Sequence, residues 1–308
     1  MQAIQINEYG DNSVLKSVQI QDPKPTANQV LVKLKASSVN PVDYKIRSGF
    51  MAGMLKKEFP FTLGWEGAGI ITEVGSDVSS FHAGDEVMVM PNFMEGGTYA
   101  EYVAVNESEV VPKPKALSFS EASTIPYSIG TAYISLIEDA QITQGQKILI
   151  HGAGGAVGQM AVQIAKNNGL YVIGTASGEK IKELQELGIN QVIDYRTTDF
   201  SEELQNLDVI LDLVGGETLA KSYALLNKGG TIISTTQPLE KSELSKHGVS
   251  GKMTFFSNNG DKFKHINKWL NEGLIKVKAP QIFKLSHAME ALSLVENRKA
   301  ESKVVFEF

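Results

Sequence analysis

The sequence of 308 residues contains no cysteine. Disulfides, thiolate zinc ligands, catalytic thiols and iron–sulfur clusters are therefore excluded from this chain. Long apolar runs are also missing. Runs such as 147–151 and 207–214 are much shorter than the roughly 20 apolar residues that a membrane-spanning helix needs. We expect a soluble chain with no membrane partner.

Clusters of basic residues are absent as well. The 29 Lys and Arg are scattered and are outnumbered by 35 Asp and Glu, which gives a net charge of −6. Nucleic-acid-binding surfaces are usually basic, so we expect a small-molecule partner and no nucleic acid. The first ten residues have neither the positive nor the apolar segment of a secretory signal, and we expect a cytoplasmic protein.

Short apolar runs separated by Gly and Pro dominate the chain up to about residue 120. They predict strands over 29–35, 69–74, 86–90 and 99–105, a spacing typical of a barrel-like antiparallel fold. From about residue 145 the pattern changes to alternating strands and amphipathic helices, which is typical of a doubly wound parallel sheet. A length of 308 residues suits two such domains.

The alternating region predicts a series of strands connected by helices. The predicted strands are 147–151, 171–174, 191–194, 207–213, 231–234 and 253–257. The predicted helices are 156–168, 179–187, 201–204 and 217–226. The tail predicts a helix over 261–272, a helix over 286–297 capped by Ser286, and a final strand over 303–308. We expect this tail to return to the first domain.

A glycine-rich turn joins the first strand of the alternating region to its first helix. Gly152, Gly155 and Gly158 would let the backbone turn sharply, approach a pyrophosphate and pack the helix on the strand. The helix N-terminus, at Ala156 and Val157, would offer N–H groups and a positive dipole end to the phosphates. A simple tight turn is the alternative, because the spacing G-x-x-G-x-x-G differs from the common motif. The surrounding strands and helices favour dinucleotide binding.

The residues after the second strand of this region indicate which dinucleotide binds. NAD-binding domains place Asp or Glu there, whereas Ser177 and Lys180 would donate to the 2′-phosphate of NADPH. We therefore expect NADPH. Glu179 leaves an alternative open, either as a ribose ligand of NADH or as a solvated residue of the helix.

Several segments in a fixed order make the chain resemble the zinc-independent quinone oxidoreductase branch of the medium-chain dehydrogenase/reductase superfamily, over essentially its full length. The segments are SVNPVDYKIRSG (38–49), FTLGWEGAGIITEVG (61–75), GDEV (84–87), GTYAEYV (97–103), IPYSIGTAY (125–133), the loop 152–158 and DLVGG (212–216). The resemblance implies an α/β protein. A GroES-like β-rich catalytic domain would comprise residues 1–121 and 262–308, and a Rossmann NADP-binding domain with a doubly wound parallel sheet residues 122–261.

Zinc alcohol dehydrogenases of this superfamily carry a catalytic Cys where this chain has Asn40, and Gly-His-Glu where it has Gly64-Trp65-Glu66. The five His show no ligand spacing, so we expect no metal. Glu66 is expected to be structural, bonding the loop backbone or Arg47. Trp65 is expected either to wall the substrate cleft or to pack in the core.

The resemblance implies NADPH-dependent reduction of quinones or α,β-unsaturated ketones and aldehydes. Hydride transfer to such electron-poor groups needs less help from a metal than reduction of a simple ketone, so positioning and hydrogen bonds to the developing enolate would supply catalysis. Asn40 is the candidate donor to the substrate oxygen, with a turn residue before Pro41 as the alternative. Tyr44 is the candidate proton donor or stacking residue, with packing as the alternative.

The resemblance also implies cofactor contacts outside the glycine-rich turn. The candidates are Thr131, Ser177, Lys180, Tyr195, Val214, Gly215, Phe256, Ser257 and Arg298, with Lys303 as an alternative to Arg298. The alternative role of Thr131 is to pack in its helix, and Arg298 and Lys303 could instead be surface charges. Phe256 and Ser257 lie at the expected end of the sixth strand. Their alternative role is to form a sheet edge that pairs with a second subunit.

Two other functions stay open beside the quinone or enone reductase. One is an enoyl-thioester reductase, and the other is an NADPH-binding sensor or structural protein with little catalysis. The second would gain support if large side chains filled the space beside the nicotinamide. The resemblance and the possible exposed sixth strand favour a homodimer.

Overall fold

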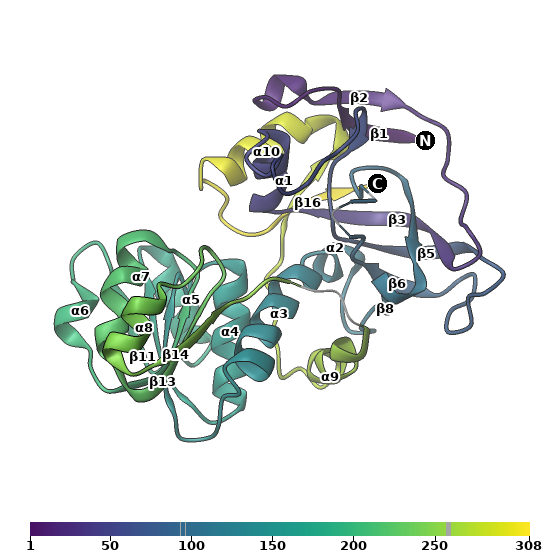
Figure 1. The fold of residues 1–308 in the computed structure, drawn as a ribbon. Coiled ribbons are helices and arrows are strands. Elements are labelled where there is room, and N and C mark those ends of the chain that lie inside the picture. Colours follow the sequence, from purple (N-terminus) through teal and green to yellow (C-terminus); the bar gives the residue numbers. More distant parts are fainter. Residues whose placement is uncertain (93, 96, 257–259) are drawn as a thin grey trace. The chain divides into compact units, whose positions relative to one another are not determined.

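The computed structural model describes residues 1–92, 94–95, 97–256 and 260–308, and contacts between its backbone atoms divide the chain into two units. Unit 1 comprises Met1–Tyr127 and Asn258–Phe308, and unit 2 comprises Ser128–Ser257. No helix in these described ranges is both long and apolar enough to cross a membrane. Each unit has its own sheets and its own buried core, so each is described separately (Figure 1).

Unit 1 is rich in strands, and most of them pair antiparallel. One sheet has the order β15-β16-β3-β5-β6-β8, with β7 also paired to β3, and a smaller sheet has the order β2-β1-β4. The strands are β1 (Gln2–Ile6), β2 (Lys16–Gln19), β3 (Gln29–Val39), β4 (Phe61–Thr62), β5 (Gly67–Val74), β6 (Glu86–Val89), β7 (Tyr102–Asn106), β8 (Val110–Pro112), β15 (Gln281–Lys284) and β16 (Val304–Glu307). Its helices are α1 (Pro41–Arg47), α2 (Phe119–Ala122), α9 (Gly260–Asn271) and α10 (Ala288–Glu296).

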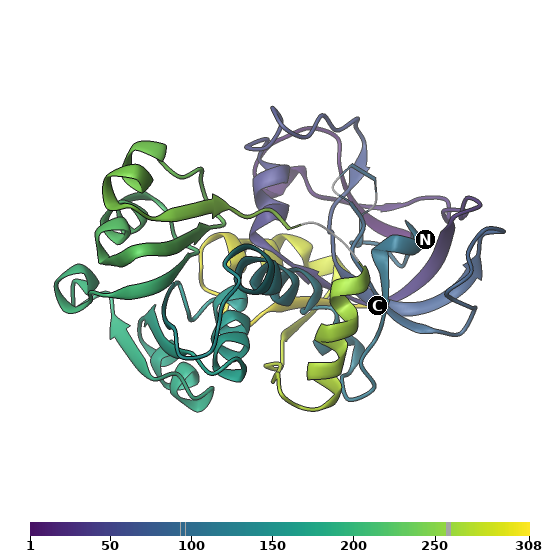
Figure 2. The same ribbon diagram turned by 60° about the horizontal axis from the view of Figure 1, so that its bottom comes forward.

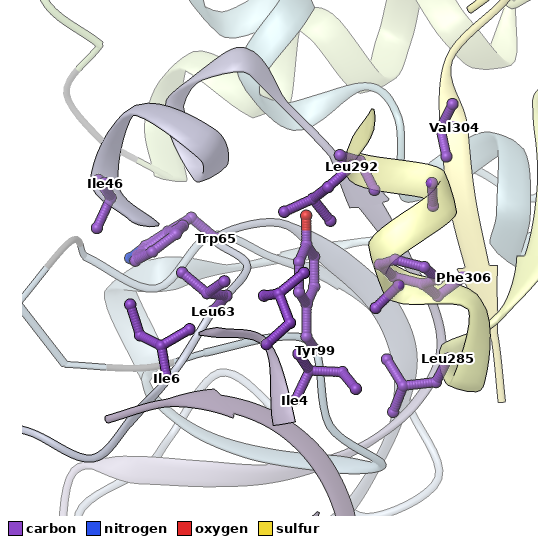
Figure 3. Close-up of a cluster of buried hydrophobic side chains, with 14 of the residues drawn as sticks. Ile4, Ile6, Ile46, Leu63, Trp65, Tyr99, Leu285, Leu292, Val304 and Phe306 are labelled. Carbon is purple, nitrogen blue, oxygen red and sulfur yellow. The ribbon is translucent and has the colours of Figure 1, made fainter. Parts of the chain in front are cut away.

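The C-terminal strand of the chain belongs to the sheet built by the N-terminal residues. β16 pairs antiparallel with β3, with Val304 opposite Val39 and Phe306 opposite Ser37, and Figure 1 shows the two strands side by side. The pairing buries the apolar side of β16 in a core that also contains Ile4, Trp65, Tyr99 and Leu292 (Figure 3). Burial of this apolar surface provides the main stabilisation of such a core.

Unit 2 is a single parallel sheet of six strands. The order β11-β10-β9-β12-β13-β14 is the 3-2-1-4-5-6 order of a Rossmann fold, and it confirms the predicted fold class. The strands are β9 (Lys147–His151), β10 (Tyr171–Ala176), β11 (Gln191–Asp194), β12 (Leu207–Asp212), β13 (Leu226–Ser234) and β14 (Ser250–Met253). The helices, drawn teal to green in Figures 1 and 2, are α4 (Ala156–Asn167), α5 (Glu179–Glu186), α6 (Phe200–Glu203), α7 (Gly216–Ser222) and α8 (Lys241–His247). Helix α3 (Pro126–Tyr133) and the π-helical stretch Ile134–Asp139 precede the sheet.

The predicted sixth strand was placed too late in the chain. The prediction followed the apolar residues 253–257, but β14 spans Ser250–Met253 and therefore does not end at Phe256 and Ser257. Gly248 explains the difference, because its left-handed conformation (φ +65°) ends α8 and turns the chain at once toward the sheet. Phe255 lies beyond the strand, and its side chain is 61% exposed.

Two helix starts also differ from the sequence predictions. Ser286 was predicted to cap the last helix, but it belongs to a short 3-10 turn, and His287 is the residue before α10. Asn40 was considered as a turn residue before Pro41, and it is instead the N-cap of α1, a helix that the sequence analysis did not predict. Pro41 at the first helical position and Asp43 at the third are the capping signals that this prediction overlooked.

Candidate active site

The glycine-rich turn adopts the conformation of a phosphate-binding loop. β9 ends at His151, Gly152 follows with φ +68°, and Gly155 is the N-cap of α4. The N-cap residue Gly155 has no side chain, so it does not compete with a ligand for the first backbone N–H groups of α4, at Ala156 and Val157. A Cβ atom on Gly155 would have only the carbonyl oxygen of Gly152 nearby, at 3.3 Å. These features fit the pyrophosphate of a dinucleotide.

Gly158 serves a different purpose in the same loop. A Cβ atom there would lie 2.4 Å from the carbonyl oxygen of Gly152 and 2.6 Å from the Cα of Ala153. These neighbours are backbone atoms that cannot move aside as a side chain can. Gly158 therefore allows α4 to pack closely against the turn.

Ser177, Lys180 and Tyr195 follow the ends of neighbouring strands. β10 ends at Ala176 and β11 at Asp194, and the two strands are parallel neighbours. The Ser177 hydroxyl donates to the Tyr195 hydroxyl at 2.9 Å, so these two predicted residues lie together. Lys180 packs against the glycine-rich turn, since a Cβ on Gly154 would be 2.8 Å from the Lys180 Cβ. The structure thus places the stem of Lys180 against the turn and the two hydroxyls together after the ends of the neighbouring strands.

Val214 and Gly215 lie at the carboxyl end of β12, where their backbone is held by a buried carboxylate. Asp212 Oδ1 accepts from the backbone N–H groups of Val214 at 3.1 Å and Gly215 at 2.9 Å. The Val214 side chain is half exposed, and its Cγ2 would be 3.3 Å from a Cβ on Gly152. The predicted loop after the fourth strand therefore borders the glycine-rich turn, at the edge where parallel sheets bind ligands.

His151 is a buried packing residue of this sheet. Its Nδ1 lies 3.3 Å from the hydroxyl of Thr175 and its Nε2 lies 3.0 Å from that of Ser222. Burial lowers the pKa of His151 to about 4, despite the opposing effect of Asp212. The ring is neutral at pH 7, and it fixes the hydroxyl of Thr175, which accepts from the N–H of Gly152 at 3.2 Å.

Thr131 and Phe256 lie in the same part of unit 2. Thr131 is half-buried on α3, and a Cβ on its neighbour Gly130 would be 2.4 Å from the ring of Phe256. The Phe256 ring therefore covers α3 at Gly130. Ser257, the other residue predicted there, lies outside the described residues.

In unit 1, Asn40 belongs to a buried polar cluster around Glu66. Glu66 Oε1 accepts from Asn40 Nδ2 at 2.7 Å and from Lys303 Nζ at 2.8 Å, and Oε2 accepts from the backbone N–H of Tyr127 at 2.8 Å. Lys303 also donates to Asn40 Oδ1 and, at 3.3 Å, to the Ser38 hydroxyl. Both ends of the Asn40 amide are thus engaged. The second N–H of Asn40 Nδ2 makes only a long hydrogen bond, to the Ser38 hydroxyl at 3.4 Å, and is therefore the donor most easily given to another acceptor.

Asp43 lies beneath this cluster and shares its burial. Its Oδ2 accepts from the Tyr99 hydroxyl at 2.5 Å and from the backbone N–H of Asn40 at 2.6 Å. Burial raises the pKa of Asp43 to about 7, although the hydrogen bonds from Tyr99 and Asn40 and the charge of Lys303 lower it. Tyr44, on the same helix, is half-buried.

The expected partners of Glu66 and Lys303 need correction. Glu66 does bond the backbone, at Tyr127, but it does not pair with Arg47, which is buried and binds Glu296 at 2.9 Å instead. Lys303 was considered for the adenosine phosphate, but its ammonium is bonded to Glu66 within unit 1. Glu66 and Lys303 are 237 residues apart in the sequence, so no local sequence pattern could have predicted that they pair.

Trp65 packs in the core, as one of the two expectations held, and Figure 3 shows it with Ile46 and Leu63. Its side chain is fully buried. Arg298, predicted near a cofactor phosphate, is an exposed residue just after α10, with φ +55°. It belongs to unit 1.

The donor set around Asn40 does not fit zinc. Asn40 and Trp65 offer neither a thiolate nor an imidazole, and the Lys303 ammonium already binds three oxygens there. A metal cation would have to displace this ammonium or lie next to it. In the parts of the chain that the structure describes, no three His, Cys, Asp or Glu residues are grouped as a metal site.

Two family models match parts of the chain. Residues 26–115 match the family of the alcohol dehydrogenase GroES-like domain, and residues 187–306 match that of zinc-binding dehydrogenases. The human mitochondrial NAD(P)H oxidoreductase RTN4IP1 is 33% identical over 99% of this chain and 88% of its own length. The 2-methylene-furan-3-one reductase of Solanum lycopersicum is 34% identical over 99% of this chain and 78% of its own length.

Solved structures show that the backbone fold of the chain is also similar to that of known proteins. A quinone oxidoreductase from Coxiella burnetii has a TM-score of 0.93 and 34% identity, covering 100% of this chain and 99% of its own. An Escherichia coli quinone oxidoreductase solved with NADPH has a TM-score of 0.90 and 26% identity, covering 100% of both chains.

The fold and the relatives together define an NAD(P)H-dependent oxidoreductase with a GroES-like unit and a Rossmann unit. The chain belongs to the quinone oxidoreductase branch of the medium-chain dehydrogenase/reductase superfamily.

Proposed function

We propose that this oxidoreductase uses NADPH to reduce quinones or α,β-unsaturated ketones and aldehydes without a metal. The observation that carries the proposal is the glycine-rich turn at the N-terminus of α4, with Lys180 packed against it and the Ser177–Tyr195 pair at the ends of the neighbouring strands. The relatives named for quinone and methylene-furanone reduction support the two substrate classes.

The preference for NADPH rests on the side chains that follow β10. A carboxylate there would repel a 2′-phosphate, whereas the hydroxyl of Ser177, the hydroxyl of Tyr195 and the ammonium of Lys180 can all donate to it. Glu179 is exposed in the first turn of α5. Its place there favours its role as a solvated helix residue.

Bound NADPH supplies a hydride, and the conjugated carbonyl of the substrate accepts the electron pair. The residues of the chain have three tasks. The turn from Gly152 to Gly158 holds the pyrophosphate, and Asp212 fixes the backbone at Val214 beside it. Asn40 donates to the substrate oxygen by giving up its 3.4 Å contact to Ser38, while its 2.7 Å bond to Glu66 keeps the amide in place. Tyr44 supplies the proton.

The experiment that tests this function is anaerobic stopped-flow oxidation of NADPH and of NADH. The electron acceptors are a benzoquinone, an ortho-quinone, a linear enone, an alkenal and an enoyl thioester. We expect faster turnover with NADPH and with a quinone or an enone. Turnover of the thioester alone would show an enoyl-thioester reductase, and tight binding of NADPH without turnover would show a binding protein.

Two further measurements check the chemistry assigned to the chain. Tyr44→Phe should lower kcat with an enone and leave the Kd for NADPH unchanged, because only the hydroxyl that gives the proton is lost. Treatment with a chelator should leave the activity of the wild type unchanged. A loss of activity that zinc restores would contradict the metal-free mechanism.

We also propose a cytoplasmic homodimer that forms through the edge of the unit 2 sheet. β14 is an edge strand, and the exposed Phe255 lies two residues after its last residue, Met253. Phe255→Asp should halve the mass measured by light scattering after gel filtration, whereas Met289→Asp, a matched change of an exposed residue in unit 1, should not. Cell fractionation tests the compartment, since the RTN4IP1 relative is named as mitochondrial.

A further inference from the structure

The ammonium of Lys180 is already bound to a carboxylate of the chain. Glu183, one turn further along α5, accepts from Lys180 Nζ at 3.2 Å with Oε1 and at 3.1 Å with Oε2. Both side chains are partly buried, with exposed fractions of 31% for Lys180 and 23% for Glu183. Solvent and salt therefore screen this pair less than they would screen a fully exposed one.

Glu183 is itself held in place by the glycine-rich turn. Its Oε2 accepts from Gln159 Nε2 at 2.9 Å, and the same Nε2 donates to the carbonyl oxygen of Gly154 at 3.2 Å. A continuous set of hydrogen bonds thus connects Gly154, Gln159, Glu183 and Lys180. Because the stem of Lys180 also packs on Gly154, the carboxylate has a fixed position beside the phosphate loop.

A carboxylate in this position must affect the binding of a second anion. A 2′-phosphate that uses Lys180 would have to share the ammonium with Glu183, and the two negative groups would repel each other. A cofactor without the 2′-phosphate makes no demand on Lys180 and does not meet this competition.

We propose that Glu183 determines cofactor specificity by competing with the 2′-phosphate of NADPH for the ammonium of Lys180, which narrows the preference for NADPH over NADH. The proposal rests on the proposed function, in which Lys180 binds the 2′-phosphate. Gln159 is the positioning residue that keeps the carboxylate at the loop.

The test compares Glu183→Gln with the wild type by titration calorimetry, with NADPH, NADH, 2′,5′-ADP and 5′-AMP as the probes. The glutamine retains an acceptor for Gln159 and removes the charge. We expect the Kd for NADPH and for 2′,5′-ADP to fall about three- to fivefold, the size of a partly screened ion pair. The Kd for NADH and 5′-AMP should change less than about twofold, because neither carries the 2′-phosphate.

Two controls separate competition at Lys180 from other effects. Glu186→Gln removes the same charge from an exposed position on α5 and should change no Kd by more than about twofold. In a Lys180→Met background, Glu183→Gln should lose most of its selective effect on NADPH, because only the direct repulsion between the two negative groups remains. A selective effect as large as the one measured with Lys180 present would show that this repulsion alone causes it, and would overturn the competition for the ammonium.

The outcomes keep the inference and the proposed function apart. Weaker binding of NADPH by Glu183→Gln, or an unchanged ratio of the NADPH and NADH affinities, would overturn the inference. Failure of the wild type to bind any of the four probes would instead contradict the proposed function.

Discussion

Gly158→Ala is expected to destabilise unit 2 through a single methyl group. The new Cβ would lie 2.4 Å from the Gly152 oxygen and 2.6 Å from the Cα and oxygen of Ala153, all of them backbone atoms. Such overpacking costs about 1–3 kcal/mol, and immovable neighbours place this site at the upper end. The better helix propensity of Ala returns about 1 kcal/mol, so we expect a net loss of about 2 kcal/mol.

Gly155→Ala is the matched control in the same turn. Gly155 has φ −78° and ψ 171°, which any residue adopts, and its Cβ would contact only the Gly152 oxygen at 3.3 Å. We expect its free energy of unfolding to stay within about 1 kcal/mol of the wild type, the usual cost of Ala at an N-cap. We expect Gly155→Ala to weaken dinucleotide binding instead.

Urea denaturation followed by far-UV circular dichroism measures both variants. Tryptophan fluorescence provides an internal reference, because Trp65 and Trp269 both belong to unit 1. For a unit of about 130 residues, the loss at Gly158 corresponds to a melting temperature lower by roughly 6–10 °C. The reasoning is refuted if Gly158→Ala is as stable as the wild type, or if Gly155→Ala is the less stable variant.

Three other changes test the two units. Lys180→Ala should weaken NADPH binding about tenfold, which is ~1.4 kcal/mol, and leave NADH nearly unchanged in a fluorescence titration; equal weakening would contradict its role. The pKa of Asp43 is raised from 3.8 to about 7, so the folded chain holds a proton that the unfolded chain has lost, and the free energy of unfolding should fall as the pH rises between these values. Asp43→Asn should flatten that slope in urea titrations between pH 4 and pH 8, and an unchanged slope would show that another group causes it. Glu296→Gln should lower the free energy of unfolding by about 1–2 kcal/mol, because it removes the bidentate carboxylate partner of the buried Arg47 guanidinium, while the 35% exposure of Glu296 screens the pair; an unchanged free energy of unfolding would contradict this.

Most strands and helices of unit 2 could be predicted because their signals are local, although α8 was not predicted and the sixth strand was misplaced. The turn from Gly152 to Gly158 lies between an apolar strand and a helix with a buried face, and β9 and α4 begin at the predicted residues. Unit 1 contains strands without such a signal. β4 has only two residues, and its pairing with β1 joins residues more than 50 positions apart. Nothing within a short window of sequence can indicate that pairing.

The residues of the candidate site also differ in how well they could be predicted, depending on whether their signals are local or distant in the sequence. Ser177 and Lys180 could be selected because they follow directly after a predicted strand. Glu183 could not, because a Glu three residues after a Lys on a helix is also the usual pattern of an exposed ion pair. Its position matters only because Gln159, from another helix, binds it to the glycine-rich turn.

The cluster around Glu66 shows how this chain compensates a buried carboxylate with its own side chains. A carboxylate with no exposure costs several kcal/mol unless a positive group or enough donors compensate it. In this chain Lys303 supplies the positive charge, and Asn40 and the backbone of Tyr127 supply further donors. The glutamate at position 66 is thus explained by its partners in unit 1, and its presence does not require a metal ion. The same bonds hold the Asn40 amide, so a change at Lys303 or Glu66 would alter the group assigned to the substrate oxygen even if neither touched the substrate.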